Sequence, residues 1–249
     1  MDPNIRLTKT PEDESHNFPE YGAAIGSLMY AAIGTRPDIA YAVQCLSQFT
    51  NNPNPEHWTA VKRVFRYLNG TQDLGIVYKR NAEINLDGYT DADWGSNPVD
   101  RKSISGYIFL IGNSPVTWSS KKQQTVALST MEAEYMAASM ATREAMWLRT
   151  LLQELGFKLE SPTTLNTDNQ SAIQFAKNSG FHARSKHIDI QYHFVREKII
   201  SNEVIIPYCA SEDNLADMLT KALPMPRHQD LTNRSGMQSE LRGSVDNIT

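Results

Sequence analysis

The chain has 249 residues, of which 40% are hydrophobic and 21% charged, and a formal net charge of −4. Gly (13) and Pro (12) are too few for a collagen-like chain, and the negative net charge argues against a simple basic nucleic-acid coat protein. No run approaches the ~18 apolar residues of a spanning helix, and the polar first residues predict no secretory signal. Two cysteines, Cys45 and Cys209, are too few for a disulfide framework and predict reduced thiols inside a cell.

The first third of the chain is predicted to be helical. Residues 1–20 are polar and predict a disordered lead. Residues 21–70 carry apolar side chains at helical spacing, as in Trp58, Val61 and Phe65. These 50 or so residues therefore predict a short helical segment ahead of the main fold.

Strands are predicted from residue 74. Gly112 and Asn113 supply a tight turn between the last two of them, so an antiparallel meander is expected. The four segments rich in β-forming residues are 74–80, 83–91, 106–112 and 115–119.

A long helix follows the meander. Ser129 is its expected cap, Glu132 the capping-box partner and Gly156 its end. Helices between the later strands permit right-handed parallel crossovers, which predicts an α/β fold with a mixed sheet flanked by helices. The remaining elements are a strand at 163–168, helices at 169–178 and 187–200, a strand at 203–208, a helix at 212–222 and a flexible tail at 225–249.

Four acidic residues fall where this order of elements can bring them together. Asp91 and Asp168 end strands, Glu134 lies early in the long helix, and Asp217 lies in the last helix. Crowded carboxylates repel one another, and a divalent ion relieves that repulsion. Oxygen ligands suit Mg²⁺, and two such ions ~4 Å apart serve phosphodiester hydrolysis.

The long helix offers two glutamates. Residues two positions apart on a helix differ by ~200° in direction, so Glu132 and Glu134 cannot both face one site. Small residues, Ala137, Ala138 and Ala141, follow Glu134 at helical spacing, as expected of a face close to a sheet. Because Glu132 is already assigned to the cap, Glu134 is assigned to the site.

Four motifs of the chain occur in a characteristic order: YTDADW, STMEAEYMAA, TDNQSA and NLADMLTKAL. In this order they closely resemble the ribonuclease H domain of copia-type LTR retrotransposon Pol polyproteins. The resemblance implies a ribonuclease H-like five-stranded mixed sheet over residues 81–224. Residues 21–80, with YGAAIGSLMYAAIGTRPDIAYAV, resemble the connection between polymerase and ribonuclease H in the same polyproteins.

That resemblance also implies a function. Asp91, Glu134, Asp168 and Asp217 would be the catalytic residues and the ligands of two Mg²⁺ ions, with Mn²⁺ as an alternative. The reaction would be metal-dependent hydrolysis of the RNA strand of RNA/DNA hybrids during reverse transcription. The expected partners are the hybrid and the remaining Pol polypeptide, with no membrane, in a cytoplasmic virus-like particle or the nucleus.

A basic window at residues 177–198, with a net charge of +3, is expected to hold the hybrid. Its candidate substrate-binding residues are Arg184, Lys186, His187 and His193. The histidine spacing, without a Cys pair, argues against zinc. A second basic window at residues 61–80 carries +4.

Two departures from the family pattern leave alternatives open. The loop before Asp217 has no His, and Cys209 or Glu212 are candidates to replace it. No two aspartates are adjacent, so the catalytic pair of a reverse transcriptase is absent from this chain. An integrase or transposase is disfavoured because Glu134 precedes Asp168. A catalytically silent fragment that only binds nucleic acid or a partner remains the alternative.

Overall fold

The computed structural model centres on a five-stranded sheet with the strand order β4-β3-β2-β5-β6. It describes residues 1, 3, 5, 7–11, 13, 14, 16–80, 82–97, 100–177 and 186–239, and of 177 and 186–190 only the backbone. Three strands are antiparallel neighbours, and two continue the sheet parallel to β2. They are β2 (Leu86–Asp93), β3 (Ile104–Ile111), β4 (Ser114–Lys122), β5 (Thr163–Asn166) and β6 (Val204–Ile205). This mixed sheet confirms the predicted α/β class.

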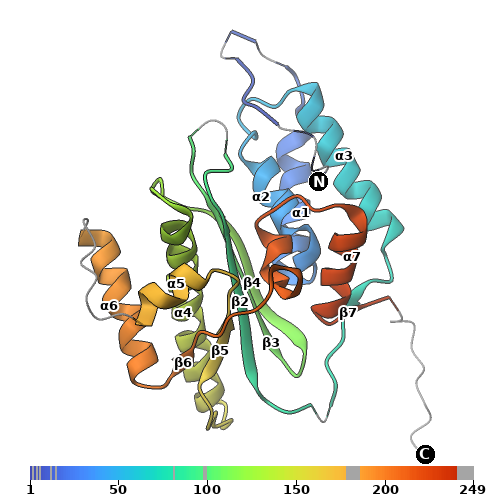
Figure 1. Ribbon diagram of the computed structural model, residues 1–249. Coiled ribbons are helices and arrows are strands. Elements are labelled where there is room, and N and C mark those ends of the chain that lie inside the picture. Colours follow the sequence, from blue (N-terminus) through green and yellow to red (C-terminus); the bar gives the residue numbers. More distant parts are fainter. Residues whose placement is uncertain are drawn as a thin grey trace, which may run out of the picture.

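Helices cover both faces of the sheet (Figure 1). One face carries α4 (Thr130–Glu154), α5 (Gln170–Lys177) and α6 (Lys186–Ile200). The other face carries the C-terminal elements and the helical region. These are η3 (Leu215–Leu219), α7 (Met225–Arg234), α1 (Tyr21–Gly34), η1 (Pro37–Ile39), α2 (Ala40–Ser47) and α3 (Pro55–Gly70).

Strand β3 shows why both faces must be covered. Side chains alternate between the two faces of a strand. Tyr107 and Phe109 join the core under α4, whereas Ile108 and Leu110 join the core under η3 and α7. A strand that is apolar on both sides is stable only as an inner strand between two layers.

The helical region packs directly on this sheet. The Trp118 indole of β4 donates a 2.7 Å hydrogen bond to the carbonyl of Ala32 in α1. The Gln48 Oε1 atom, just after α2, accepts from Lys122 Nζ at 3.0 Å and Asn97 Nδ2 at 2.8 Å. The domain boundary predicted near residue 80 stays a prediction. The helical region before it and the sheet after it pack against each other.

Several local predictions are confirmed. Gly112 and Asn113 both have positive φ, as a tight hairpin turn requires. The Ser129 hydroxyl accepts from the Glu132 amide and caps α4. The Glu132 carboxylate reaches back one residue further than expected, to the amide of Leu128 at 2.9 Å.

The helix predicted at 212–222 is wrong. Two 3₁₀ turns stand there, η2 (Ser211–Asp213) and η3, separated by Asn214 in an extended conformation. The Asn214 side chain accepts from the Ala216 amide and donates to the Thr90 carbonyl of β2. These side-chain bonds compete with a continuous helix and tie η3 to the sheet.

Both ends of the chain are more structured than predicted. Residues 225–239 are not a flexible tail, because α7 buries Leu231 and β7 (Met237–Gln238) pairs with β1 (Gly75–Ile76) outside the main sheet. In the predicted disordered lead, Leu7 lies in the helical core and Thr10 donates to the Asn52 carbonyl. Residues 240–249 lie outside the described part of the chain.

A glycine lets η3 approach the sheet beside Asp91. Gly106 of β3 lies opposite Asp91 in the antiparallel register. A Cβ atom at Gly106 would lie 2.8 Å from both the Leu219 Cβ and the Thr220 Cγ2 atoms, and 3.3 Å from the Ala216 carbonyl. A larger residue would therefore push η3 off the sheet.

We expect Gly106→Ala to lower the free energy of unfolding by about 1–3 kcal/mol through overpacking. The matched control is Gly26→Ala in α1, where a Cβ meets nothing within 4 Å, and there helix propensity predicts a gain of up to about 1 kcal/mol. Urea unfolding of both variants measures this difference. Equal stability of Gly106→Ala and the wild type would contradict the close approach.

Candidate metal centre

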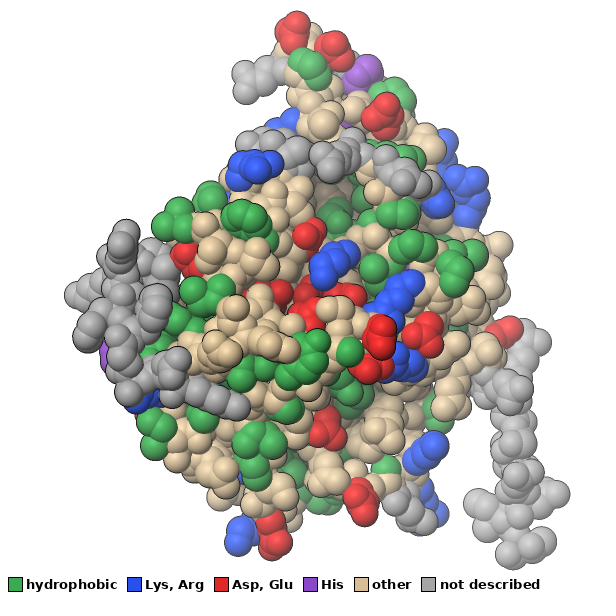
Figure 2. Space-filling model, viewed as in Figure 1, with side chains coloured by type: hydrophobic (Ala, Val, Ile, Leu, Met, Phe, Trp, Pro, Cys, Tyr) green, Lys and Arg blue, Asp and Glu red, His purple; other side chains and the backbone are tan. Residues whose placement is uncertain are grey.

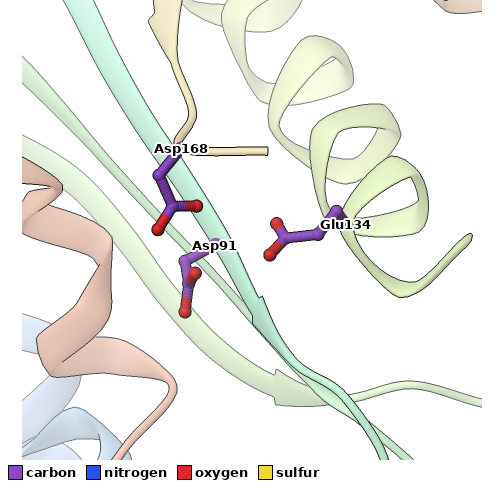
Figure 3. A group of neighbouring side chains, drawn as sticks. All are labelled: Asp91, Glu134 and Asp168. Atoms are coloured by element: carbon purple, nitrogen blue, oxygen red, sulfur yellow. The ribbon is translucent and has the colours of Figure 1, made fainter. Parts of the chain in front are cut away.

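Three of the four predicted carboxylates converge at one edge of the sheet (Figure 3). Asp91 comes from β2, Glu134 from α4, and Asp168 from the turn just after β5. One oxygen from each lies within 4.8 Å of the others. This agrees with the expected gathering of side chains at strand ends.

Glu134 is the buried member that has the fewest compensating contacts. The residue is 5% exposed, and its Oε2 atom has no hydrogen-bond partner. It points at Asp91 and Asp168 because the alanine-rich face of α4 lies close to the sheet (Figure 3). Glu132 instead binds the Leu128 amide, so the structure separates the two glutamates as predicted.

Asp168 is held by the loop in which the family pattern expects a histidine. The Ser211 hydroxyl donates a 2.6 Å hydrogen bond to Asp168 Oδ2. Arg227 of α7 donates to the carbonyls of Ser211 and Glu212, which fixes the loop. Neither Cys209 nor Glu212 is seen to bind Asp168 in the described residues.

Asp217 stands apart from the three-carboxylate cluster and is joined to it by a lysine. The Lys221 Nζ atom lies 2.9 Å from Asp217 Oδ1 and 3.3 Å from Asp91 Oδ2. Arg227 adds a second cation 3.4 Å from Asp217. Acidic side chains gather near the centre of this face, with Lys and Arg side chains beside them (Figure 2).

The electrostatics of the cluster are dominated by burial. Burial, and then the charges of Asp91 and Asp168, raise the pKa of Glu134 to about 9. Burial raises the pKa of Asp91 to about 6, against the stabilising charge of Lys221 and the Thr220 hydroxyl. Burial disfavours the Lys221 ammonium, but Asp91 and Asp217 more than offset this and its pKa is raised.

The donor set fits a hard divalent cation. Its atoms are carboxylate oxygens, one of them buried without a partner, and these are the ligands that Mg²⁺ and related ions take. A cation here would bind the Glu134 Oε2 atom and offset both the burial of the carboxylate charge and its repulsion by Asp91 and Asp168, which together raise its pKa. The three residues therefore form a candidate metal centre.

The predicted substrate-binding residues are only partly described. Arg184 lies outside the described residues, and Lys186 and His187 are described by their backbone alone. His193 is exposed on α6 and lies against Tyr192. Their role stays a prediction.

Sequence reasoning missed four residues that contact the carboxylates. One of them had a signal, since Lys221 follows Asp217 by four residues, the spacing of an ion pair on a helix. The others become neighbours only through the tertiary fold. The four are Ser211, Thr220, Lys221 and Arg227.

The raised pKa of Glu134 predicts a pH dependence of stability without metal. Because the folded state favours the protonated acid, its stabilising contribution is complete below about pH 4.5 and is lost as pH rises to about 9. In EDTA, the unfolding free energy of the wild type should fall relative to that of Glu134→Gln, by at most about 1.4 kcal/mol per pH unit.

Urea unfolding at pH 5, 7 and 9 measures this difference, with Glu132→Gln as the control that keeps the wild-type slope. Parallel pH profiles for the wild type and Glu134→Gln would contradict the assignment.

Curated relatives match the sequence, although no protein-family model does. The chain is 43% identical over 236 residues to the retrovirus-related Pol polyprotein from transposon TNT 1-94 of Nicotiana tabacum. It is also 43% identical over 237 residues to that from transposon RE1 of Arabidopsis thaliana. These matches cover 94% and 95% of this chain, but only 18% and 16% of the polyproteins.

A shorter relative is the secreted RxLR effector protein 161 of Plasmopara viticola. It is 52% identical over 132 residues, which are 53% of this chain and 92% of that protein.

Solved structures of the foamy viral protease-reverse transcriptase share the fold. The foamy viral protease-reverse transcriptase, solved in complex with an RNA/DNA hybrid, gives a TM-score of 0.52 at 14% identity over 83% of this chain and 26% of that one. LC11-RNase H1, isolated from compost, gives 0.41 at 14% identity over 55% of this chain and 93% of that one. Among the described residues, no helix has the length and apolarity to cross a membrane.

The architecture is the ribonuclease H-like class expected from the sequence, and over most of its length the chain is homologous to one part of the retrovirus-related Pol polyproteins of transposons.

Proposed function

We propose that this chain hydrolyses the RNA strand of RNA/DNA hybrids as the ribonuclease H part of a retrotransposon Pol polyprotein. Asp91, Glu134, Asp168 and Asp217 would hold two Mg²⁺ ions, with Mn²⁺ as the alternative. The proposed partners are the hybrid and the rest of the Pol polypeptide, in a cytoplasmic particle or the nucleus.

The observation that carries this proposal is the buried Glu134 carboxyl group beside Asp91 and Asp168, whose Oε2 atom has no hydrogen-bond partner. A buried charge without a partner is costly, and such groups concentrate at functional sites. The relatives support the choice of reaction, because the chain is similar to Pol polyproteins over most of its length.

The chain's own residues would divide the work. When bound, the ions supply charge that activates water and neutralises the attacking and leaving oxygens. Thr220 and Ser211 hold the Asp91 and Asp168 carboxylates in orientation through hydroxyl hydrogen bonds. Selectivity for the hybrid would come from its shape and its 2′-hydroxyl groups, which the basic window at residues 177–198 would contact. The bases themselves would not be read.

The alternative function is a silent fragment that binds nucleic acid or a partner without cleaving. The similarity to a secreted effector keeps that alternative in view. A cleavage assay on labelled hybrid, with Mg²⁺ or with EDTA, separates the two functions because only the enzyme needs the cation.

Glu134→Gln should reduce cleavage by more than about 100-fold, since even residues that only support metal ligands often cost 10–100-fold. Glu132→Gln is the matched control. It should retain activity and lose about 1 kcal/mol of stability or less, because it removes only the charge that binds the Leu128 amide. If Glu132→Gln were inactive and Glu134→Gln active, the metal ligand on α4 would be Glu132 and not Glu134.

Replacing Arg184 and Lys186 with Ala should weaken hybrid binding with little sequence dependence. Each lost phosphate contact should flatten the plot of log affinity against log salt by about one unit of slope. Binding isotherms at several salt concentrations measure the slope. An unchanged slope would remove this window from the binding surface and favour the window at residues 61–80.

A further inference from the structure

Asp91 has acidic neighbours on two sides, Glu134 and Asp168 on one and Asp217 on the other, and among the described residues a lysine pairs with the carboxylates on the Asp217 side only. Towards Glu134 and Asp168, no Lys or Arg side chain of the described residues forms an ion pair with either carboxylate. Towards Asp217, the Lys221 ammonium contacts both carboxylates, at 3.3 Å from Asp91 and 2.9 Å from Asp217. Before any metal ion binds, the Asp217 side of Asp91 therefore already holds a positive charge, which the side of Glu134 and Asp168 lacks among the described residues.

The Lys221 side chain is the most exposed member of this group of three. Its side chain is 35% exposed, whereas those of Asp91 and Asp217 are 1% and 10% exposed. A lysine ammonium is a compact charge on a flexible stem, so it can move to solvent while the carboxylates stay fixed. Thr220 and Arg227 keep contacts with Asp91 and Asp217 that do not depend on Lys221.

We propose that Lys221 is a tethered cation that occupies the place between Asp91 and Asp217 and must swing out before a divalent ion is held there. The inference rests on the proposed metal function and adds an order to it. Ion binding begins at Asp91, Glu134 and Asp168, because in the described part of the chain Lys221 pairs with only one of these three carboxylates, that of Asp91. Occupancy between Asp91 and Asp217 is second and weaker, because it requires Lys221 to give up two carboxylates.

The test is Lys221→Met in the full chain, titrated with MnCl₂ in the absence of nucleic acid. Free Mn²⁺ measured by electron paramagnetic resonance gives the number and affinity of the ions bound. The wild type should show one tighter and one weaker ion. The variant should bind the weaker ion at least about tenfold more tightly, which corresponds to about 1.4 kcal/mol, with a smaller change for the first.

Lys122→Met is the matched control. Lys122 is comparably exposed, at 28%, and pairs with Asp100 at 2.8 Å instead of with the cluster. It should retain the two wild-type Mn²⁺ affinities. A melting scan without metal supplies a second readout, in which Lys221→Met should melt below the wild type and recover more on adding Mn²⁺. Lys221→Gln replaces Lys221→Met if the latter does not fold.

Equal Mn²⁺ affinities in the wild type and Lys221→Met would overturn the inference. Loss of the weaker ion in the variant would also overturn it, because Lys221 would then assist the ion and not compete with it. No Mn²⁺ binding by either protein would instead refute the proposed metal function itself, and the inference with it.

Discussion

The structure is organised around the cost of burying carboxylates beside one another. Asp91 and Glu134 are nearly inaccessible, and with Asp168 they place oxygens within 4.8 Å. Such an arrangement resists ionisation, as the raised pKa values of Asp91 and Glu134 express. A fold tolerates this only if rigid elements fix each side chain and a cation offsets the charge.

The elements around the cluster meet the first requirement, and they meet the second for Asp91 and Asp217. Gly106 allows η3 to lie directly on β3, which brings Thr220 and Lys221 to Asp91. The C-terminal helix α7 contributes Arg227, which binds Asp217 and the loop that carries Ser211. Segments that follow β6, the last strand of the five-stranded sheet, thus take part in positioning the candidate metal centre.

The sequence predicted the sheet, α4 and the choice of Glu134 because local patterns determine them. Segments rich in β-forming residues, the Ser129 cap and the alanine face of α4 are each visible within a few residues. The broken helix near Asn214 was not predictable, because its cause is a hydrogen bond to Thr90, 124 residues away. The helix α7 was not predicted because distant contacts stabilise it as well. Its sequence is polar, and one such contact joins the His228 ring to the Asp38 carbonyl.

The central claim is that Asp91, Glu134 and Asp168 form a divalent-cation site. The most direct test is an anomalous difference map from crystals of the chain soaked in MnCl₂ at a pH near 8. The account predicts a Mn²⁺ peak in contact with all three carboxylates, including the Glu134 Oε2 atom that lacks a partner. Absence of a peak there at saturating Mn²⁺, with Glu134 still unpartnered, would contradict it.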